Sequence, residues 1–390
     1  MMLVTGAVLS GLAAESSLPV MAAPSQRIAP AIKLPAGVVK AWSNPATQSI
    51  YTGPKDSDFV GELKDALKAT PAGATVRAAT YSISDMNVVK LFTDAKRRKV
   101  HVKFTSWTKA QKASPKQIGK LKRALGTNTE KSSYLKLCRG SCYISGSDSA
   151  SQHAKIVTIS SVINTKGKRV RDIVFITSAN FSKAAVTRTW NHTQLIVGCS
   201  KIYKALTAYM DGMRHDKTKR NFRPVTACGY TLFLYPSAHL KNQAIETLKD
   251  VKCKATKSTK TVVRVMMYVW PSSQRVAAKQ LAMLHKQGCN VRVIVTSGTT
   301  NKGNVGVMRK AGVTVYDAKV KDRYLHAKLV VISGRVGKKL VDQVITGSAN
   351  FSVAAIRRNN ETQLVIRGEA HVREALNFFD RVAKKSRRYK

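Results

Sequence analysis

The sequence is poor in acidic residues, with 21 Asp and Glu against 67 Lys and Arg in a chain of 390 residues. The formal net charge of +46 is spread along the whole chain and is not confined to one tail. Because the sequence shows no cluster of carboxylates that would hold a hard cation, we expect neither a metal nor another cofactor. A surface of this charge attracts polyanions such as nucleic acid, an anionic membrane or an acidic wall polymer. We therefore expect an anionic substrate as the partner of this chain.

Long hydrophobic runs are also missing. No segment beyond the N-terminus approaches the roughly 18 continuous apolar residues of a membrane-spanning helix, so the mature protein is expected to be soluble. Residues 1–22 combine an apolar run with small residues near its end, which predicts an export signal. Residues 23–45 are rich in Ala and Pro and are predicted to form a flexible leader. These features predict a secreted protein, and no stable protein partner is implied, so a monomer is expected.

Closely spaced Cys and His sets such as CxxC are absent from the sequence, which argues against a zinc site. The six cysteines form an even number, and in an exported chain this favours three disulfides. Cys138 and Cys142 bracket a tight turn and are expected to pair with each other. For the other four we expect the pairs Cys199–Cys228 and Cys253–Cys289.

The most informative feature present is an internal duplication. The segment QHAKIV, which begins at Gln152, is followed by ITSANFS and then by NHTQLI. The segment LHAKLV, which begins at Leu325, is followed by ITGSANFS and then by NETQLV. These ordered matches predict two comparable domains, at residues 46–225 and 226–390.

Each half also contains a short apolar run, a helical pattern and a second strand-like run, at residues 75–81, 86–98 and 100–104 in the first half and 262–268, 274–287 and 291–295 in the second. The order strand, helix, strand predicts parallel pairing with a helical crossover. We therefore expect an α/β fold with two similar sandwich domains related by a pseudo-twofold axis. The HxK and SAN segments should lie on neighbouring strands of each sheet.

The repeated residue types suit phosphoryl transfer. In an HxK segment on a strand, the His and Lys side chains would point to the same face. Histidine can act as a nucleophile or as a proton donor, and the lysine ammonium can hold a phosphate oxygen. Each half provides only one such His, so a reaction that needs both a nucleophile and an acid requires the two copies to face each other.

The doubled motif resembles that of the phospholipase D superfamily, HxKxxxxD followed by GSxN, across roughly residues 48–385. The resemblance implies a metal-independent phosphodiesterase in which one motif His attacks phosphorus to give a phosphohistidine and the other protonates the leaving oxygen. Carried over to this sequence, His153 is the expected nucleophile and His326 the expected acid. The rest of the expected site consists of Lys155, Asn180, Lys328 and Asn350 as catalytic residues and Ser178 and Ser348 as substrate-binding residues.

The sequence departs from the family pattern in three ways. Ser160 and Ser333 stand where the motif places Asp, and Thr177 stands where GSxN places Gly. The resemblance implies that this Asp supports neighbouring residues and does not react itself, and the related tyrosyl-DNA phosphodiesterases also lack it. We therefore expect the activity to survive. Glu361 occupies a position that resembles an acid orienting an active-site His, whereas its counterpart is His192, so the site is expected to be asymmetric.

Three functions remain open at this point. The favoured one is phospholipase D-like hydrolysis of glycerophospholipids, with residues 268–271 as the candidate segment for insertion into lipid. The second is a secreted DNA or RNA endonuclease, which the charge favours and for which Trp107, Trp190 and Trp270 could stack on bases. The third is an inactive protein that binds anionic polymers on the same scaffold.

Overall fold

The structure is a computed structural model that describes Met1 and residues 34–389, except residues 44, 57, 216–220 and 257. The predicted export signal and the first part of the predicted leader lie outside the described residues, apart from Met1. Residues Lys33–Lys390 make up one compact unit, and that unit alone is described below. Within its described part, no helix combines the length and apolar character needed to span a bilayer.

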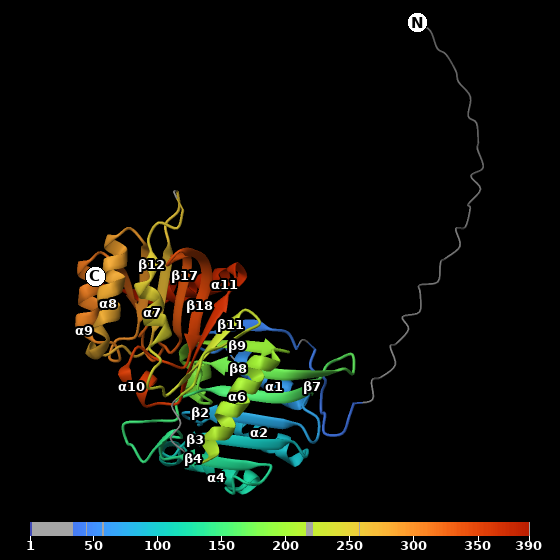
Figure 1. The fold of residues 1–390 in the computed structure, drawn as a ribbon. Coiled ribbons are helices and arrows are strands. Elements are labelled where there is room, and N and C mark those ends of the chain that lie inside the picture. The colour runs from blue at the N-terminus through green and yellow to red at the C-terminus, as the bar shows by residue number, and fades with distance from the viewer. Residues whose placement is uncertain (2–33, 44, 57, 216–220, 257, 390) are drawn as a thin grey trace. The chain divides into compact units, whose positions relative to one another are not determined.

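The first half of the unit is built on a sheet with the strand order β1-β9-β8-β7-β2-β3-β4 (Figure 1). Strands β2, β3 and β4 run parallel to one another, and the remaining neighbours are antiparallel. The strands are β1 (Gln48–Thr52), β2 (Thr75–Thr80), β3 (His101–Trp107), β4 (Tyr134–Cys138), β7 (Ile156–Ile163), β8 (Arg169–Thr177) and β9 (Thr189–Val197). A small hairpin of β5 (Gly140–Ser141) and β6 (Ile144–Ser145) follows β4.

The second half repeats this plan with the order β10-β11-β19-β18-β17-β13-β14-β15-β20, and β12 pairs with β17. Strands β13, β14 and β15 are parallel, like their counterparts β2, β3 and β4. The strands are β10 (Val225–Ala227), β11 (Tyr230–Tyr235), β12 (Val251–Lys252), β13 (Val262–Met267), β14 (Asn290–Val295), β15 (Thr314–Asp317), β17 (Lys328–Val336), β18 (Lys339–Gly347), β19 (Glu361–Arg367) and β20 (Arg387–Arg388). One short strand, β16 (Tyr324–Leu325), pairs instead with β9 of the first sheet.

Helices lie on both sides of the sheets. They are α1 (Asp58–Lys68), α2 (Met86–Arg97), α3 (Lys109–Ala113), α4 (Pro115–Leu125), α5 (Lys183–Thr187), α6 (Ser200–Gly212), α7 (Gln243–Lys249), α8 (Arg275–Lys286), α9 (Lys302–Lys310), α10 (Val353–Arg357) and α11 (Glu369–Lys384). The predicted crossover helices are confirmed as α2 and α8, to within one residue at each end. In α2, the side chain of Asp85 accepts a hydrogen bond from the backbone N–H of Asn87 and caps the first turn.

The predicted α/β architecture with two similar halves is confirmed. The HxK segments lead into β7 and β17, and each of these strands pairs with the strand that precedes SAN, so the two segments lie at the ends of neighbouring strands. Three hydrophobic cores hold the unit together. Two of them lie in separate halves, packed around Phe92 and Phe175 in the first and around Trp270 and Val293 in the second.

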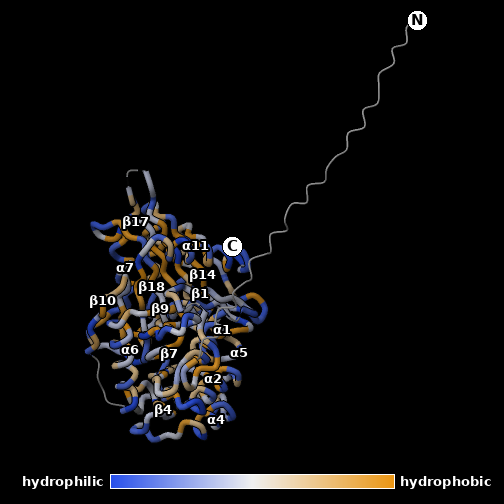
Figure 2. The backbone as a smooth tube through the Cα atoms, turned by 90° about the vertical axis from the view of Figure 1, so that its right-hand side faces the viewer, coloured by the Kyte–Doolittle hydropathy of each residue, from blue (hydrophilic) through white to orange (hydrophobic). Residues whose placement is uncertain are grey.

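The third core is shared between the two halves. It brings together apolar residues of both sheets with those of α6 and α11, including Ile176, Leu206, Leu329 and Phe378. In Figure 2 hydrophobic residues are prominent along strands such as β14 and β18. Burial of this shared apolar surface fixes one half against the other, and this is a condition for a site built from both.

The prediction of a flexible leader over residues 23–45 is wrong for the part that the structure describes. The indole ring of Trp42 is only 2% exposed, and its Nε1–H donates to the Glu62 carboxylate at 3.1 Å. The backbone N–H of Trp42 donates to the carbonyl of Ile163, at the end of β7. Composition alone suggested a flexible segment, but burial of one large aromatic side chain anchors it.

The three disulfides form in the predicted pairs, Cys138–Cys142, Cys199–Cys228 and Cys253–Cys289. Cys199 lies at the start of α6 and Cys228 in the turn between β10 and β11, so this bond links the first half to the second. Cys253 and Cys289 join two segments within the second half.

We expect the Cys199–Cys228 bond to contribute more to stability than the Cys138–Cys142 bond. The sequence separations are 29 and 4 residues, and a longer closed loop restricts the unfolded chain more strongly. Replacing Cys199 and Cys228 by Ala should lower the free energy of unfolding by about 3–4 kcal/mol, against about 2 kcal/mol for Cys138 and Cys142. Urea unfolding followed by circular dichroism measures both, and equal losses would contradict the expectation.

Candidate active site

The two HxK segments lie where the chain enters a central strand of each sheet. His153 and Lys155 come just before β7, and His326 lies two residues before the start of β17 at Lys328. The expectation that each pair sits within a strand is therefore wrong. In each copy the lysine Nζ donates back to the carbonyl oxygen of its own histidine, so the two side chains are held together by a local hydrogen bond.

Each histidine is attached to the opposite half of the molecule. The backbone N–H of His153 donates to the carbonyl of Asn360 at 3.1 Å, next to β19. The backbone N–H of His326 donates to the carbonyl of Trp190 in β9 at 3.0 Å. Asn360, the first residue of NETQ, and Trp190, which directly precedes NHTQ, thus hold the HxK segment of the other copy, and both histidines lie at the junction of the two halves.

The side chain of His153 is oriented by Glu361. Its Nδ1 lies 2.7 Å from Oε1 of Glu361, whose side chain is fully buried. Because a carboxylate can only accept, Nδ1 carries the proton and Nε2 keeps its lone pair. Glu361 was predicted to orient a histidine, and the geometry places it against the one expected to act as the nucleophile.

The side chain of His326 is oriented by a residue that the sequence prediction missed, Asn191. The Nδ1 of His326 lies 3.3 Å from Oδ1 of Asn191, which also accepts from the Ser178 hydroxyl at 2.9 Å. The Asn191 amide nitrogen donates to the Thr189 hydroxyl at 2.6 Å, so its oxygen faces His326. His326 therefore also carries its proton on Nδ1. Asn191 is the first residue of the repeated NHTQ segment, so the internal duplication could have identified it as a candidate site residue.

The two histidines consequently have different partners, a carboxylate for His153 and a neutral amide for His326. The position equivalent to Glu361 is held by His192, whose Nδ1 lies 2.8 Å from the Thr346 hydroxyl in the second half. Burial lowers the pKa of His192 to about 3, so this side chain is neutral and supplies no negative charge. The asymmetry expected from the sequence is present in the geometry.

The ionisation of the site is dominated by burial. Burial lowers the pKa of His153 to about 4, Glu361 opposes this shift, and Lys155 and Lys328 add to it. The pKa of His326 lies well below its usual value because of burial and because Lys328, Lys155 and His153 are close. Residues of both copies therefore act on the same imidazole. This electrostatic coupling is a further sign that the two half-sites converge.

Burial also dominates the ionisation of the two lysines. Burial lowers the pKa of Lys155 to about 7, with Glu361 opposing the shift. Burial also places the pKa of Lys328 well below its usual value, and Lys155 contributes to that shift. An anionic group between the lysines would relieve both effects, since it favours the ammonium forms. The arrangement therefore fits a bound phosphate.

The SAN segments connect these residues to the sheets. The hydroxyls of Ser178 and Ser348 accept backbone N–H groups of His192 and Thr362 at 3.0 Å, and both serines are fully buried. This geometry gives the two serines a positioning role. Asn350 uses Oδ1 to accept from the backbone N–H of Val269 at 3.1 Å, whereas Oδ1 of Asn180 is buried without a hydrogen-bond partner among the described residues.

The sequence prediction also missed two tyrosines that occupy equivalent positions in the two halves. Tyr81 follows β2 and Tyr268 follows β13, and their rings lie 5.0 and 4.7 Å from those of His153 and His326. Lys155 lies 5.5 Å from the centre of the Tyr81 ring, and Lys328 lies 5.0 Å from that of Tyr268. Each tyrosine is the last residue of one of the matched runs at 75–81 and 262–268. The duplication could therefore have identified both as candidate site residues.

Of the tryptophans considered for base stacking, only one flanks the site. Trp107 stacks on Tyr81 at 4.9 Å and is partly exposed. Trp270 is fully buried against Phe351, so it neither stacks on a base nor inserts into lipid as part of residues 268–271. Trp190 packs against Phe378 of the shared core. The sequence could not separate these roles because all three follow or lie within strands.

The positions of the missing motif aspartates lie away from the histidines. Ser160 lies in β7, five residues beyond Lys155, which corresponds to about 16 Å of extended chain. Its hydroxyl accepts the backbone N–H of Thr75 at 2.9 Å. Ser333 lies at the equivalent place in β17, opposite Asp342 of β18. The substitution of Asp by Ser therefore affects strand contacts and leaves the His and Lys pairs intact.

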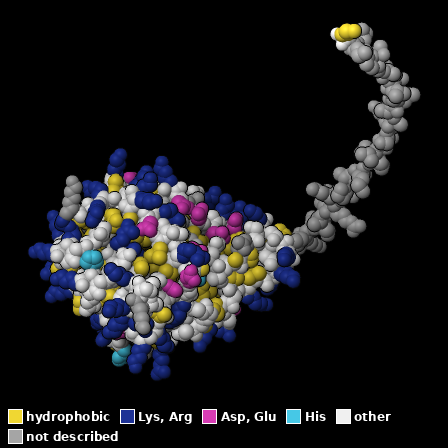
Figure 3. Space-filling model, turned by 90° about the horizontal axis from the view of Figure 1, so that it is seen from above, with side chains coloured by type: hydrophobic (Ala, Val, Ile, Leu, Met, Phe, Trp, Pro, Cys, Tyr) yellow, Lys and Arg dark blue, Asp and Glu magenta, His cyan; other side chains and the backbone are white. Residues whose placement is uncertain are grey.

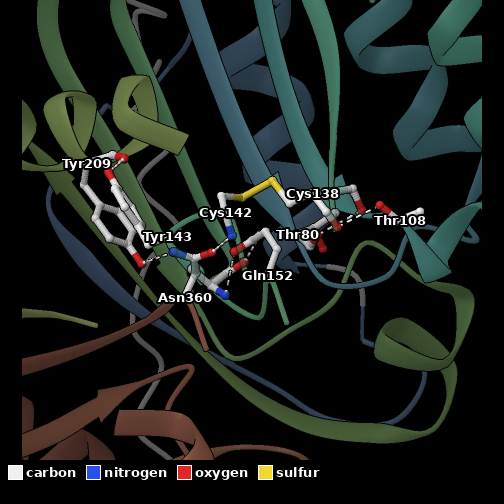
Figure 4. The surroundings of a disulfide bond; sticks show 10 residues. Thr80, Thr108, Cys138, Cys142, Tyr143, Gln152, Tyr209 and Asn360 are labelled. Atoms are coloured by element: carbon white, nitrogen blue, oxygen red, sulfur yellow. Dashed lines mark hydrogen bonds between the residues drawn. A yellow bond between two sulfur atoms is a disulfide. The ribbon is translucent and has the colours of Figure 1, made fainter. Parts of the chain in front are cut away.

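The Cys138–Cys142 disulfide lies close to Asn360, the residue before Glu361 (Figure 4). The backbone N–H of Cys142 donates to Oδ1 of Asn360 at 2.7 Å, and the Asn360 amide nitrogen donates to the hydroxyl of Tyr209 at 3.2 Å. Asn360 directly precedes Glu361 and its carbonyl holds the backbone of His153. The loop closed by the disulfide thus contacts Asn360, whose carbonyl holds the backbone of His153 and which directly precedes Glu361.

These features define a class of protein, an α/β protein with two related halves whose His and Lys pairs both lie at the junction of the halves. In the part of the chain that the structure describes, no group of three or more His, Cys, Asp or Glu side chains is placed to hold a metal ion.

The chain belongs to the phospholipase D-like family. The family model described as "Cardiolipin synthase, PLD-like domain" matches residues 63–214 and 253–383, which together exceed half of the chain. Both matches contain one HxK segment and one SAN segment. Membership of the superfamily, which the doubled motif predicted, is therefore confirmed.

Curated relatives point to the same family. The mitochondrial cardiolipin hydrolase of Canis lupus familiaris is 31% identical over 132 residues, which cover 33% of this chain and 48% of the relative. The protein of that name from Xenopus tropicalis is 26% identical over 203 residues, or 50% of this chain and 90% of the relative. The chain spans about half the length of the first of these relatives.

Solved structures show that the fold is shared. The phosphatidylserine synthase of Haemophilus influenzae Rd KW20 is similar with a TM-score of 0.57 and 12% identity, over 88% of each chain. The polyphosphate kinase of Porphyromonas gingivalis is similar with a TM-score of 0.56 and 15% identity, over 86% of this chain and 50% of its own. At these identities the likeness concerns the fold alone.

The contact between His153 and Glu361 predicts the effect of Glu361→Gln. The amide can still accept from Nδ1–H, but the lost negative charge no longer stabilises an imidazolium, so kcat should fall by about 100-fold or more. Because Glu361 raises the pKa of His153, its loss should move the acid limb of the pH profile to lower pH. A fall in rate with an unmoved acid limb would contradict this role. Glu246→Gln removes one charge from α7 and serves as the control.

The pH dependence of kcat/KM should be bell-shaped, because this parameter reports the groups of the free protein. The neutral form of His153, with a pKa of about 4, is lost as the pH falls through that value. The protonated form of His326, whose pKa lies well below its usual value, and the charged form of Lys155, with a pKa of about 7, are both lost as the pH rises. Rates with soluble bis(p-nitrophenyl) phosphate over the acid and neutral range test this. A profile that stays flat through weakly alkaline pH is the contrary result.

Proposed function

We propose that this protein is a secreted, metal-independent phosphodiesterase that hydrolyses glycerophospholipids in the manner of phospholipase D, through a phosphohistidine. The observation that carries the proposal is the convergence of two His and Lys pairs with unequal partners, a carboxylate on His153 and an amide on His326. The family supports phosphodiester chemistry, and the relatives named cardiolipin hydrolase support a phospholipid as substrate.

In the first step, Nε2 of His153 attacks phosphorus while Nδ1–H remains hydrogen-bonded to Glu361. The bond between phosphorus and the leaving oxygen breaks, and protonated His326 gives that oxygen its proton. The positive charge that forms on His153 is stabilised by the neighbouring carboxylate. Lys155 and Lys328 hold the non-bridging oxygens, where negative charge accumulates in the five-coordinate transition state.

In the second step, water attacks the phosphorus and transfers a proton to His326. The bond between His153 and phosphorus breaks, and the phosphate monoester leaves. His326 suits this exchange because Asn191 fixes its ring without a negative charge that would hold the proton. Its low pKa makes the imidazolium a strong acid toward a leaving alkoxide.

Export is supported by the three disulfides, because such bonds persist in oxidising compartments. An excess of Lys and Arg would hold the protein at an anionic lipid surface. Figure 3 shows Lys and Arg distributed over the visible face, with fewer Asp and Glu among them.

Nucleic acid is the second candidate substrate. The stacked pair of Tyr81 and Trp107 lies beside His153, and Lys109 lies 5.1 Å from the centre of the Trp107 ring. Aromatic surfaces with nearby cations are typical of proteins that bind single-stranded nucleic acid, and a net charge of +46 favours such binding. Vesicles of mixed phospholipids and plasmid DNA, each incubated with the protein in EDTA, distinguish the two candidates by head-group release and strand cleavage.

The roles of the histidines can be separated with an activated substrate. In His326→Asn the good leaving group of bis(p-nitrophenyl) phosphate needs no acid, so one equivalent of p-nitrophenol should be released in a burst and a phosphohistidine should accumulate on residue 153. His153→Asn should show no burst. Stopped-flow absorbance and mass spectrometry measure both, and EDTA should change neither. A burst in His153→Asn alone would reverse the assignment, and loss of activity in EDTA would contradict the mechanism.

A further inference from the structure

In each half of the molecule, the ring of one tyrosine lies over the lysine of the HxK pair. Nζ of Lys155 lies 5.5 Å from the centre of the Tyr81 ring, and Nζ of Lys328 lies 5.0 Å from the centre of the Tyr268 ring. Both distances fall within the roughly 6 Å over which an ammonium group is attracted to the face of an aromatic ring. Each ring also contacts the histidine of the same pair. The proposed mechanism gives neither tyrosine a role.

The duplicated scaffold produces this contact in both halves. Tyr81 directly follows β2 and Tyr268 directly follows β13, and these strands pair with β7 and β17, into which the HxK segments lead. In the second half, Met267 at the end of β13 stands opposite Lys328 at the start of β17. Each tyrosine therefore leaves its strand beside the HxK segment of its own half.

A second aromatic ring supports each of the two tyrosines. Trp107, the last residue of β3, stacks on Tyr81 with ring centres 4.9 Å apart and 24° between the ring planes. Tyr324, the first residue of β16, lies 5.6 Å from Tyr268 with 30° between the planes. These neighbours restrict the rotation of the two tyrosine rings, so each ring stays in place over its lysine.

Both ammonium groups are buried without an acidic partner. Lys155 and Lys328 are buried, and each Nζ donates one hydrogen bond to the carbonyl oxygen of its own histidine. Within the described part of the chain, no acidic side chain lies within salt-bridge distance of either Nζ, and the buried Glu361 carboxylate pairs with His153. Burying a charge is costly unless it is compensated, so a lysine in this position tends to lose its proton.

An aromatic ring suits this position better than a carboxylate. The face of the ring attracts an ammonium group but carries no net charge. A carboxylate would also stabilise the ammonium group, but it would repel the phosphate oxygens and compete with them for the N–H donors. An ammonium group has three donors, and each lysine gives one to a histidine carbonyl, so the other donors remain available to a phosphate.

The ionisable groups that act on Lys155 come from both halves. They are His153 of the same segment, Glu361 of β19, and His326 and Lys328 of the second HxK segment. Burial lowers the pKa of Lys155 to about 7, and Glu361 opposes this shift. Burial raises the pKa of the Tyr81 hydroxyl, so this side chain is neutral at the same pH. Any contribution of Tyr81 to the charge of Lys155 therefore comes from the face of its ring.

We propose that Tyr81 and Tyr268 are positioning residues, each of which keeps the buried lysine of its own half charged and in place through a cation–π contact. This inference rests on the proposed function, because it takes Lys155 and Lys328 as the groups that hold the phosphate oxygens. The rings carry the effect and the hydroxyls do not. When a ring is weakened, its lysine loses its proton at lower pH, and a neutral amine then faces the phosphate.

The test changes the electron density of the ring while its shape stays nearly constant. Tyr81 is replaced by Phe and by phenylalanines that carry increasing numbers of fluorine atoms, which weaken the attraction of the ring face for a cation. NMR of the protein labelled with 13C at Cε of lysine gives the pKa of Lys155, and Lys155→Arg assigns the signal. This pKa should be unchanged in Tyr81→Phe and should fall stepwise with fluorination, by about 1 for the fully fluorinated ring.

The same fluorinated residues in place of Phe92 provide the control. This ring packs against Phe104 and Phe181 in the core of the first half, so the pKa of Lys155 should not respond. A pKa that does not fall along the series at Tyr81, or that falls equally in the control, overturns the proposal. A fall already complete in Tyr81→Phe assigns the effect to the hydroxyl and also overturns it.

The second half is tested by the same series at Tyr268. The pKa of Lys328 should fall as the ring is fluorinated, because its Nζ lies over this ring at 5.0 Å. A pKa of Lys328 that stays constant along this series overturns the role of Tyr268.

Binding of inorganic phosphate gives a second readout, measured by titration calorimetry. With the fully fluorinated ring at position 81, a smaller fraction of Lys155 is charged, so the affinity at about pH 7 should fall by about fivefold. At about pH 5 Lys155 is charged in either protein, and the difference should nearly vanish. An equal loss of affinity at both pH values indicates a damaged site and contradicts the proposed role.

Neither readout requires turnover. If the wild-type protein hydrolyses no phosphodiester, the proposed function fails, but the response of Lys155 to fluorination still tests Tyr81. If hydrolysis is observed and the pKa of Lys155 does not respond, the role of Tyr81 is wrong and the proposed function stands. The two proposals can therefore fail separately.

Discussion

The structure depends on an exchange between its halves, in which the histidine of each HxK segment is held by residues at or next to a strand of the other half. The hydrogen bond from His153 to the buried Glu361 carboxylate is the most consequential of these contacts. A buried carboxylate is costly unless it is hydrogen-bonded or paired with a positive charge, and a positively charged imidazole is stabilised by a nearby carboxylate. Glu361 and His153 therefore stabilise each other. The shared core around α6 and α11 keeps the two groups together.

Duplication supplies two similar half-sites, and small differences between them assign different roles. Glu361 and His192 occupy matching positions, yet one provides negative charge and the other is neutral. Asn191 takes over the orientation of His326 without adding charge. A symmetric site would give two equivalent histidines, whereas this one favours a cation on His153 and a proton exchanged at His326.

The same divergence extends to the rim of the site. The first half presents the stacked rings of Tyr81 and Trp107, whereas in the second half the ring of Tyr268 lies beside that of Tyr324. Tyr81 and Tyr268 directly follow parallel strands at the same edge of their sheets, where loops commonly carry functional residues. The two halves thus share a scaffold and differ in the residues at this edge.

The sequence by itself determined the duplication, the α/β plan and the identity of the His and Lys pairs, because these follow from periodicity and from repeated short motifs. The pairs Cys199–Cys228 and Cys253–Cys289 follow from no such pattern, and the structure fixes them. Only the tertiary structure decided that Asn191 and not a carboxylate faces His326, that Trp270 is buried while Trp107 flanks the site, and that Trp42 anchors the predicted leader. These facts depend on contacts between residues at least 20 positions apart in the sequence, such as Trp42 with Glu62 and His326 with Asn191, and on which side of a strand becomes covered. Local patterns carry no information on such contacts, because burial is a property of the assembled chain.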